Sequence, residues 1–496
     1  MDLDELMALD AGALSRRIAA REVSCRELMQ ASLQRIAVLN PQHNAIVSLR
    51  DTDALLREAD ARDAQLARGE RCGWMHGFPV AVKDLSDAEG LPTTQGSLAV
   101  GRRIARSDAL FVLRMKRAGA IVIGKTNTPE FGLGSHTFNE VFGVTRNAWD
   151  PSKSAGGSSG GAAVALALGM VPVADGSDFM GSLRNPAAFN NVVGMRPSRG
   201  RVPAVPAEDV FYAQLGTEGP MARTSEDVAR LLCTLSGWDA RAPLSLADAL
   251  PDPDAADPIG VPPGKRIGWL GSIWPDLPLE PGVGDLCEAA LRKLQAAGYV
   301  VEPCTLDVPR DAAWTAWLRL RQMLTGGKLR AIHAQPELRA RMKPEAQWEV
   351  EQGLQLTGAQ LYEASALRSA VYQAFARLFE RFDHVAAPSA QVFPFDAALR
   401  WPQSIAGVAM DTYHRWMEIV APFTMAGLPA VSVPVGFNAE GLPMGLQIAG
   451  PARGDLQVLA IARAFEAIAP WAQQRPPGLA RTRATMQHPK TKETQE

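Results

Sequence analysis

Residues 156–189 read GGSSGGAAVALALGMVPVADGSDFMGSLRNPAAF and form the most informative part of the chain. A loop of small residues, 156–161, opens into the apolar segment AAVALALGM, which is typical of a buried helix or strand. The run MVPVAD (Met170–Asp175) then predicts a buried strand, and a second loop with Gly and Ser follows it. Small residues that lead into a buried element often bring backbone close to a ligand, so this segment predicts a functional site.

Short apolar runs elsewhere in the chain predict further buried strands. They are Pro79–Asp84, Ala120–Lys125, Arg266–Gly271, Tyr299–Cys304, His384–Ser389, Ala430–Phe437 and Met444–Gly450. Helical periodicity lies between many of them, at Ala109–Ala118, Ser225–Leu235, Gly284–Ala297, Gly358–Phe382 and Leu456–Ala467. Strands that alternate with helices predict an α/β fold whose sheet is covered by helices on both faces.

We expect one large domain in which four segments can be distinguished. Residues 1–70 form an N-terminal helical segment packed on the core, with a capping box at Ser24 and Glu27 and a helix over Thr52–Ala67. Residues 71–236 hold the motifs. Residues 237–481 continue the same domain after a surface linker rich in Pro and Asp at Pro251–Pro263, and the polar residues 482–496 predict a mobile tail.

Composition excludes several classes of protein. The 496 residues include 51 Lys and Arg against 53 Asp and Glu, and this net charge of −2 gives no general attraction to nucleic acid or to an anionic membrane. The longest apolar run, Ala162–Ala174, is too short to span a bilayer, and the N-terminal MDLDELMALD is acidic, unlike a secretory signal. Five dispersed cysteines form no CxxC pair, so neither a disulfide framework nor a zinc site is predicted. We expect a cytoplasmic protein.

The segment GAIVIGKT (Gly119–Thr126) has the letters of a phosphate-binding loop, GxxxxGK[ST]. Such a loop needs a flexible turn followed directly by a helix. Here the middle residues Ala-Ile-Val-Ile favour a buried strand, and Pro129 interrupts any helix that would follow. We therefore interpret this segment as a strand.

The loop GGSSGG contains the pattern GxSxG twice, centred on Ser158 and on Ser159. A nucleophile elbow needs an apolar strand before the turn, and the preceding WDPSKSA does not make one. A base is also not evident, because no local signature marks the downstream histidines His333, His384, His414 and His488. The alternative interpretation is a flexible Gly/Ser linker.

In the second loop, Gly176 and Gly181 bracket a short segment that ends at Ser182. An oxyanion hole requires successive backbone N–H groups that point at one spot. Candidates for these donors are Phe179, Met180, Gly181 and Ser182. The alternative is that Ser182 is an ordinary loop hydroxyl and that Asp178 and Arg184 form a structural ion pair.

Lys83 ends the predicted strand PVAVKD, on the same face as Ala81. A lysine at this place is usually paired with an acid or extends to solvent. The functional alternative is a desolvated, neutral amine that acts as a base, which requires a pKa lowered from about 10.4 to roughly 7–8.

Together and in this order, VAVKD, GGSSGG and GSDFMGSLRNPAAF resemble the amidase signature family. Other segments that resemble it are LNPQHNAIV, GFPVAVKD, GKTNTPEFG, VVGMRPSRGRV, GPMART and AGLPAVSVPVGF followed by GLPMGLQIAGP. The resemblance covers roughly residues 11–467. It implies the fold of that family, a large mixed β-sheet covered by helices.

The resemblance implies a Ser–Ser–Lys triad with no histidine. Lys83 matches the base, Ser158 the bridging serine that follows a cis peptide bond, and Ser182 the nucleophile. The two serines are 24 residues apart, as the family pattern expects. No metal or organic cofactor is needed. Supporting roles are expected for Gly157, Ser159, Asp178 and Arg184.

Two positions depart from the family pattern. The family commonly has Gly at the position of Met180 and Thr or Ile at that of Phe179, so we expect a reshaped acyl pocket with its backbone donors retained. The variable region that sets substrate choice corresponds to about Asp311–Tyr413. Tryptophans there, or just after it, could line an apolar or aromatic pocket or belong to the core: Trp314, Trp317, Trp348, Trp401 and Trp416.

The resemblance predicts an enzyme that hydrolyses a small carboxylic acid amide, such as an aryl or other apolar amide, to the acid plus ammonia or amine. A homodimer is common in the family. One alternative is the glutaminase-type, amidase-like component of a tRNA-dependent amidotransferase, which usually has cysteine at the position of Asn190. The others are a catalytically silent scaffold and a histidine-dependent α/β-hydrolase, in which Lys83 would be dispensable.

Overall fold

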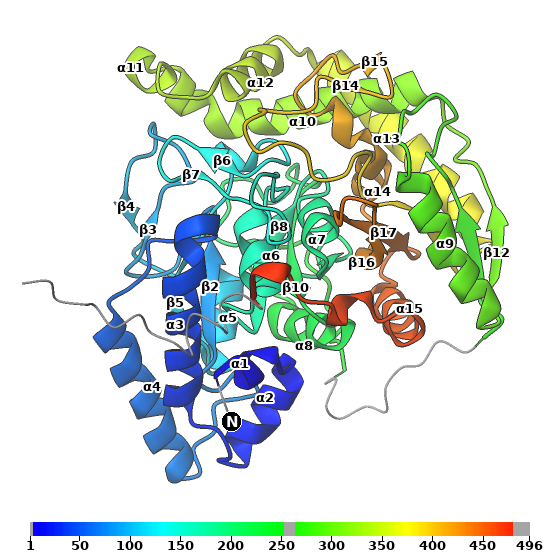
Figure 1. The fold of residues 1–496 in the computed structure, drawn as a ribbon. Helices are drawn as coiled ribbons and strands as arrows, with labels where there is room; N and C mark the ends of the chain where they lie inside the picture. The colour runs from blue at the N-terminus through cyan, green and yellow to red at the C-terminus, as the bar shows by residue number, and fades with distance from the viewer. Residues whose placement is uncertain (1–2, 252–262, 480–496) are drawn as a thin grey trace, which may run out of the picture.

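The centre of the molecule is a mixed sheet (Figure 1). In the computed structural model, which describes residues 3–251 and 263–479, this sheet has eight strands in the order β12-β11-β13-β17-β16-β9-β10-β8. Strands β12, β11 and β13 run parallel, and each further neighbouring pair is antiparallel. The strands are β8 (Val173–Asp178), β9 (Val193–Arg196), β10 (Thr217–Ala222), β11 (Arg266–Trp269), β12 (Val300–Pro303), β13 (His384–Pro388), β16 (Ala430–Phe437) and β17 (Pro443–Ala449).

A smaller sheet extends the core beside β8. It has the order β1-β5-β2, with β1 at Ile46–Val47, β2 at Pro79–Lys83 and β5 at Ile121–Thr126. Strand β2 packs next to β8, and the backbone N–H of Lys83 donates to Asp175 Oδ2 at 3.2 Å. Short two-stranded pairs complete the β-structure: β3 (Pro92–Thr93) with β4 (Arg103–Ile104), β6 (Phe138–Asn139) with β7 (Gly143–Val144), and β14 (Ser404–Ile405) with β15 (Val408–Ala409).

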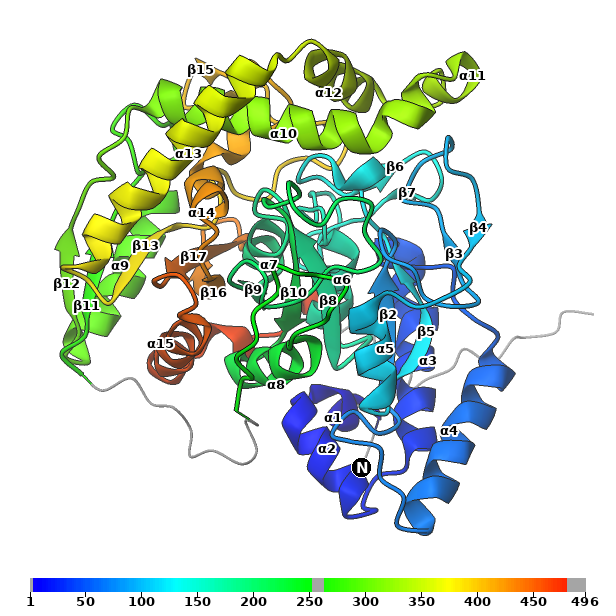
Figure 2. The same ribbon diagram turned by 180° about the vertical axis from the view of Figure 1, so that it is seen from behind.

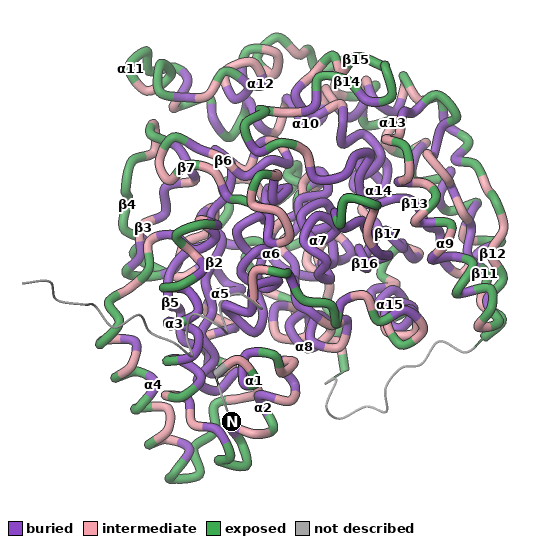
Figure 3. The backbone as a smooth tube through the Cα atoms, in the orientation of Figure 1, coloured by how far each residue is buried: buried purple, intermediate pink, exposed green. Residues whose placement is uncertain are grey.

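Helices enclose the large sheet in two groups of mutual contact, α6 with α7 and α8 with α15 and α9 (Figures 1 and 2). Their bounds are α6 (Gly160–Ala167), α7 (Arg184–Asn190), α8 (Ser225–Leu235), α9 (Val283–Ala296) and α15 (Asp455–Ile468). Every residue of α6 and α7 is buried, which matches their place in the middle of the tube in Figure 3. The large mixed sheet between helices confirms the predicted fold class.

The remaining helices form two peripheral groups. At the N-terminal side lie α1 (Leu3–Ala8), α2 (Ala11–Ala19), α3 (Cys25–His43) and α4 (Thr52–Ala67), and α5 (Leu110–Arg117) precedes β5. Across the top of Figure 1 runs an arm made of α10 (Arg310–His333), α11 (Pro336–Arg339), α12 (Pro344–Leu354) and α13 (Gly358–Phe379), with α14 (Ala421–Ala426) beneath it. Short 3₁₀ turns are η1 (Glu130–Gly132), η2 (Arg415–Val420) and η3 (Trp471–Gln473).

Most predicted elements occur within a few residues of their predicted bounds. The capping box of α3 is present, because Ser24 and Glu27 exchange hydrogen bonds with each other's backbone N–H groups. The strand predicted at Met170–Asp175 is displaced: β8 covers Val173–Asp178, so Gly176 belongs to the strand and not to the loop after it. Strands β9 and β10 and helices α10 and α12 were not predicted.

Strand β5 confirms the interpretation of GAIVIGKT. All of Ile121–Thr126 is buried, and Lys125 Nζ donates to Ser86 O at 2.6 Å and pairs with Asp84 at 3.3 Å. Its amine is thus held inside the protein. Of the predicted linker Pro251–Pro263, residues 252–262 lie outside the described residues, as does the predicted tail 482–496. Among the described helices, none combines the length and the hydrophobicity that crossing a bilayer would need.

Candidate active site

Lys83 lies at the end of β2 in a cluster of serine hydroxyls. Its side chain is 1% exposed, and its Nζ donates to Ser158 Oγ at 2.8 Å, to Ser159 Oγ at 2.9 Å and to Ser177 Oγ at 2.9 Å. Ser158 and Ser159 come from the loop before α6, and Ser177 comes from β8. Three segments far apart in sequence therefore place neutral hydroxyls around one buried amine, and among the described residues no carboxylate is recorded as a hydrogen-bond partner of Nζ.

Burial lowers the pKa of Lys83 to about 8, because water cannot solvate its charge. The negative charges of Glu218, Asp175 and Asp178 act in the opposite direction and limit the fall of this pKa. An amine with a pKa near neutrality is uncharged for part of the time, so it can accept a proton as well as donate one. The lysine is thus suited to work as a general base.

The peptide bond between Gly157 and Ser158 is cis, as the resemblance implied. The surrounding segment 135–137 holds this loop: Gly157 N donates to Ser135 Oγ at 3.2 Å, and Thr137 Oγ1 donates to Gly156 O at 2.8 Å. Gly157 has little free space, since a Cβ there would lie 3.0 Å from Thr137 Oγ1. The loop is therefore a rigid part of the core and not a flexible linker.

Ser182 lies in the turn between β8 and α7, with 5% of its surface exposed. The turn needs glycine at 181, where φ is +77° and a Cβ would lie 2.2 Å from Asn185 Oδ1. Ser182 O accepts from the backbone N–H of Ser159 at 3.2 Å. This bond joins the two serine loops side by side.

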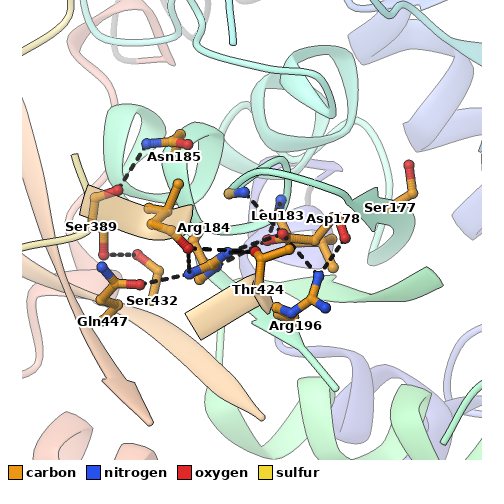
Figure 4. A network of polar contacts seen from close by, with 12 residues as sticks. Ser177, Asp178, Leu183, Arg184, Asn185, Arg196, Ser389, Thr424, Ser432 and Gln447 are labelled. Atoms are coloured by element: carbon orange, nitrogen blue, oxygen red, sulfur yellow. Dashed lines mark hydrogen bonds and ion pairs between the residues drawn. The ribbon is translucent and has the colours of Figure 1, made fainter. Parts of the chain in front are cut away.

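A buried ion-pair network holds the turn in place (Figure 4). Asp178 accepts from Arg184 through two bonds of 3.0 Å, and Arg196 Nη1 donates to Asp178 Oδ1 at 3.3 Å. These guanidinium groups hold the pKa of the Asp178 carboxyl well below its ordinary value, although burial alone would raise it. In Figure 4 Arg184 also reaches Gln447 at 2.7 Å and Thr424 at 3.0 Å, so the network ties the turn to the C-terminal part of the chain.

The same carboxylate takes up some of the backbone donors of the turn. Gly181 N donates to Asp178 Oδ1 at 2.9 Å, and Leu183 N donates to Asp178 Oδ2 at 3.3 Å. The N–H of Gly181 is therefore not free to meet a substrate oxygen, contrary to its predicted place in an oxyanion hole. Within the described ranges, no acceptor is recorded for the other predicted donors, the N–H groups of Phe179, Met180 and Ser182.

The arm of helices reaches this turn through α10. The Phe179 ring lies 5.8 Å from the Trp317 ring, and the Arg321 guanidinium lies 5.3 Å from the centre of the Phe179 ring. Arg321 is itself held by Glu349 of α12 at 2.5 Å and by Tyr413 Oη at 2.6 Å. The variable region therefore contacts the predicted oxyanion turn directly.

The predicted tryptophans divide between two environments. Trp317 contacts Phe179, whereas Trp314 and Trp348 stack on His414, at 5.2 and 6.2 Å between ring centres. Trp401 contacts Tyr413, and Trp416 packs on Phe395 in the core. Only Trp317 of these five contacts the turn that carries Ser182 in the recorded ring contacts of the described residues.

Two residues near Lys83 escaped prediction. Ser177 and Glu218 lie opposite each other in the antiparallel pair β8–β10, so both side chains face the lysine side of the sheet. Ser177 is visible in the GSD motif, but its direction depends on the register of β8, which was placed three residues too early. Glu218 has no sequence signal, because β10 was not predicted.

The alternative of a histidine base finds no geometric basis. In the part of the chain that the structure describes, no hydrogen bond joins a histidine to Ser158, Ser159 or Ser182. His414 stacks among aromatic rings, and His384 lies in β13. Likewise, the described residues contain no group of three His, Cys, Asp or Glu side chains that could hold a metal ion.

Comparison with known proteins agrees with the geometry. Residues 27–459 match the protein family described as Amidase. The chain belongs to the amidase family. An acylamidase from Rhodococcus erythropolis is 33% identical over 488 residues, covering 94% of this chain and 97% of the relative. The amidase-like component of glutamyl-tRNA(Gln) amidotransferase from Acidothermus cellulolyticus is 35% identical over 495 residues, covering 94% and 95%.

Solved structures of the amidase family share the whole fold. A bacterial aryl acylamidase of the amidase signature enzymes superposes with a TM-score of 0.87 at 31% identity, covering 94% of this chain and 97% of that one. A 6-aminohexanoate cyclic dimer hydrolase superposes with a TM-score of 0.84 at 26% identity, covering 95% and 99%. The resemblance to the amidase signature family is confirmed.

Proposed function

We propose that this protein is an amidase that hydrolyses carboxylic acid amides through an acyl-enzyme on Ser182. The observation that carries the proposal is the buried Lys83 amine with Ser158 Oγ at 2.8 Å, next to a loop whose backbone bonds to the carbonyl of Ser182. A serine hydroxyl is a weak nucleophile until a base removes its proton. A lysine that is neutral near physiological pH supplies such a base.

The proposed reaction has two halves. Neutral Lys83 takes the proton of Ser158, Ser158 takes that of Ser182, and Ser182 Oγ bonds to the amide carbonyl carbon. The C–N bond then breaks, and the relay returns the proton to the leaving nitrogen, which departs as ammonia or amine. Water adds to the acyl ester, its proton passes along the same relay, and the acid leaves with Ser182 regenerated.

The oxyanion that forms in both halves needs donors that do not have to move. We assign this role to the backbone N–H groups of Phe179, Met180 and Ser182, and we leave out Gly181 because Asp178 occupies its N–H. Asp178 and Arg184 support the site by fixing the turn. Each such donor is worth about 3–4 kcal/mol of transition-state stabilisation.

We propose an amide with an apolar or aryl acyl group as the substrate. Phe179, Met180 and Trp317 present apolar surface around the turn, and Arg321 stacks over Phe179. The acylamidase and aryl acylamidase relatives are consistent with this choice. The cytoplasmic location and the homodimer expected from the sequence stay predictions, and light scattering of the purified chain measures the second.

The experiment is peptide-mapped labelling with a fluorophosphonate, combined with hydrolysis of a panel of aryl and aliphatic amides. An adduct on Ser182 in the wild type, together with no adduct and no hydrolysis in Ser182→Ala, is expected. An adduct on Ser158 or Ser159 would refute the assignment of the nucleophile. A wild type that is folded, unlabelled and inert to every amide would favour the silent scaffold.

The second candidate is a glutaminase-type component of an amidotransferase, favoured by the 35% identity to the Acidothermus cellulolyticus protein. Asn190, buried at the end of α7, stands where that component usually has cysteine, and it donates to Ala155 O at 2.8 Å. Glutamine hydrolysis that appears only with partner proteins would establish this candidate. Hydrolysis of an apolar amide by the chain alone would exclude it.

A further inference from the structure

Glu218 is the acidic residue placed most directly against the lysine cluster. It lies in β10 opposite Ser177 of β8, and Ser177 Oγ accepts from Lys83 Nζ at 2.9 Å. Residues opposite each other in an antiparallel pair share a face, with Cβ atoms roughly 4.5–5.5 Å apart. The strand register therefore places the Glu218 carboxyl beside the hydroxyl that the lysine binds.

This carboxyl lacks the partners that buried acids usually have. Among the described residues, no group hydrogen-bonds Glu218 Oε2, although the atom is buried. By contrast, Asp178 is paired with two arginines, and Asp175 accepts the backbone N–H of Lys83. A buried carboxylate without a hydrogen-bond donor is costly, and a nearby positive charge is its remaining source of stabilisation.

The charged groups around the pair are few. Glu218 and two aspartates of β8, Asp175 and Asp178, act on Lys83, and Glu218 is the strongest of these attractive charges. Glu218 in turn faces Lys83, Asp175 and Lys328 of α10. The cations nearest the aspartates are Lys125 for Asp175 and the arginines Arg184 and Arg196 for Asp178.

We propose that Glu218 is a positioning residue that acts through Lys83: its charge decides the pH above which the lysine is neutral and the amidase is active. This inference rests on the proposed function. While the carboxylate is ionised, it favours the ammonium form of Lys83 and delays the appearance of the base as the pH rises. Ser177, between the two groups, keeps them from direct contact and holds the amine toward the serines.

The direction of the effect follows from the two environments. Burial lowers the pKa of Lys83 and raises the pKa of Glu218 to about 7, so the two groups exchange charge in the same pH range. Neutralising Glu218 leaves desolvation of Lys83 opposed only by the aspartates. The pKa of Lys83 then falls, and the acid limb of the activity profile moves to lower pH.

The test is the pH dependence of kcat/KM for Glu218→Gln, which keeps the size of the side chain and removes its charge. We expect the midpoint of the acid limb to fall by about one pH unit. One unit below the wild-type midpoint, the variant then shows about five times the wild-type fraction of its own plateau activity. Glu218→Asp is the matched control, because it keeps the charge and should keep the wild-type midpoint.

A structural role predicts another result. If Glu218 only supports the fold, Glu218→Gln lowers the plateau and leaves the midpoint where it was, and this outcome overturns the proposal. Should that variant not fold, Lys328→Met substitutes for it at a solvent-exposed position of α10. Losing this cation makes Glu218 harder to ionise, so the midpoint falls by less, and an unchanged or higher midpoint overturns the proposal.

Labelling of Ser182 separates this inference from the proposed function. The rate of fluorophosphonate labelling is measured against pH in the wild type and in Glu218→Gln. If Ser182→Ala keeps full activity, the proposed function fails. If Ser182→Ala is inert and unlabelled while the labelling midpoint is the same in wild type and Glu218→Gln, the inference about Glu218 alone fails.

Discussion

The ion-pair network under the nucleophile turn gives the sharpest test of how the site is held. Asp178→Asn keeps the shape of the side chain and removes the charge that Arg184 and Arg196 share. All three side chains are fully buried, so both guanidinium groups stay in the core without a counter-charge. One of the two backbone bonds, from Gly181 or Leu183, is lost as well, because only one amide oxygen remains to accept.

Breaking a buried ion pair by removing one partner destabilises a protein by about 3–5 kcal/mol. With an unfolding entropy of about 2.1 cal/mol/K per residue, this loss lowers the Tm of the 496-residue chain by about 3–5 °C. The effect on catalysis is larger. A turn displaced by about 1 Å lowers kcat by on the order of 100-fold, because the oxyanion donors are carried by the same residues.

The cost of Asp178→Asn depends on pH. The folded protein holds the pKa of Asp178 far below that of the unfolded chain, about 3.9. A depressed pKa contributes stability that is fully present above the unfolded value and is lost as the pH falls toward the folded value. The difference in unfolding free energy between wild type and Asp178→Asn is therefore largest above about pH 5 and shrinks below about pH 4.

The assay combines thermal unfolding at several pH values with kcat on one amide substrate. Asp455→Asn is the matched control: Asp455 is equally buried, pairs with Arg201 at 3.1 Å and caps Ser198 N at 2.7 Å, away from the serine loops. Both variants should lose stability, and only Asp178→Asn should lose kcat beyond the loss of folded protein. Equal kcat in the two variants would refute the argument that the Asp178 network positions the turn.

Three further predictions concern the lysine, the tryptophan and the arm of helices. The kcat/KM of the wild type should rise with pH through a midpoint near 8, because only the neutral Lys83 amine accepts a proton, and Lys83→Met should lose at least about 100-fold. A pH profile that falls between pH 6 and 9 would contradict this. Trp317→Leu should lower the selectivity for aryl over aliphatic amides by about tenfold, as measured by the ratio of their kcat/KM values, whereas Trp401→Leu should not. Arg321→Met should destabilise the fold by about 3–5 kcal/mol in denaturant unfolding, because it leaves Glu349 buried without its cation, and adding Glu349→Gln should recover part of that loss.

Local patterns predicted most of the secondary structure because the residues concerned carry unambiguous signals. The alternation of buried strands and amphipathic helices indicated the α/β class, and Ser24 with Glu27 marked the start of α3. The run AAVALALGM left helix and strand open, and tertiary packing decides for helix: a Cβ at Gly161 would lie 2.4 Å from Asn127 N, so α6 crosses the β5 segment closely. Strands β9 and β10 were missed because Gly and Pro within them weaken the sequence signal.

The motifs in the sequence alone determined which residues are candidates for the triad, since Lys83, Ser158 and Ser182 each stand in a distinctive segment. Only the tertiary structure decided how they meet, because hydrogen bonds between positions 75 or more residues apart depend on the packing of β2, β8 and α6. It also decided that Asp178 takes the N–H of Gly181, that α10 lies against Phe179, and that Glu218 faces the lysine. These relations follow from strand register and long-range burial, which the order of residues along the chain does not reveal.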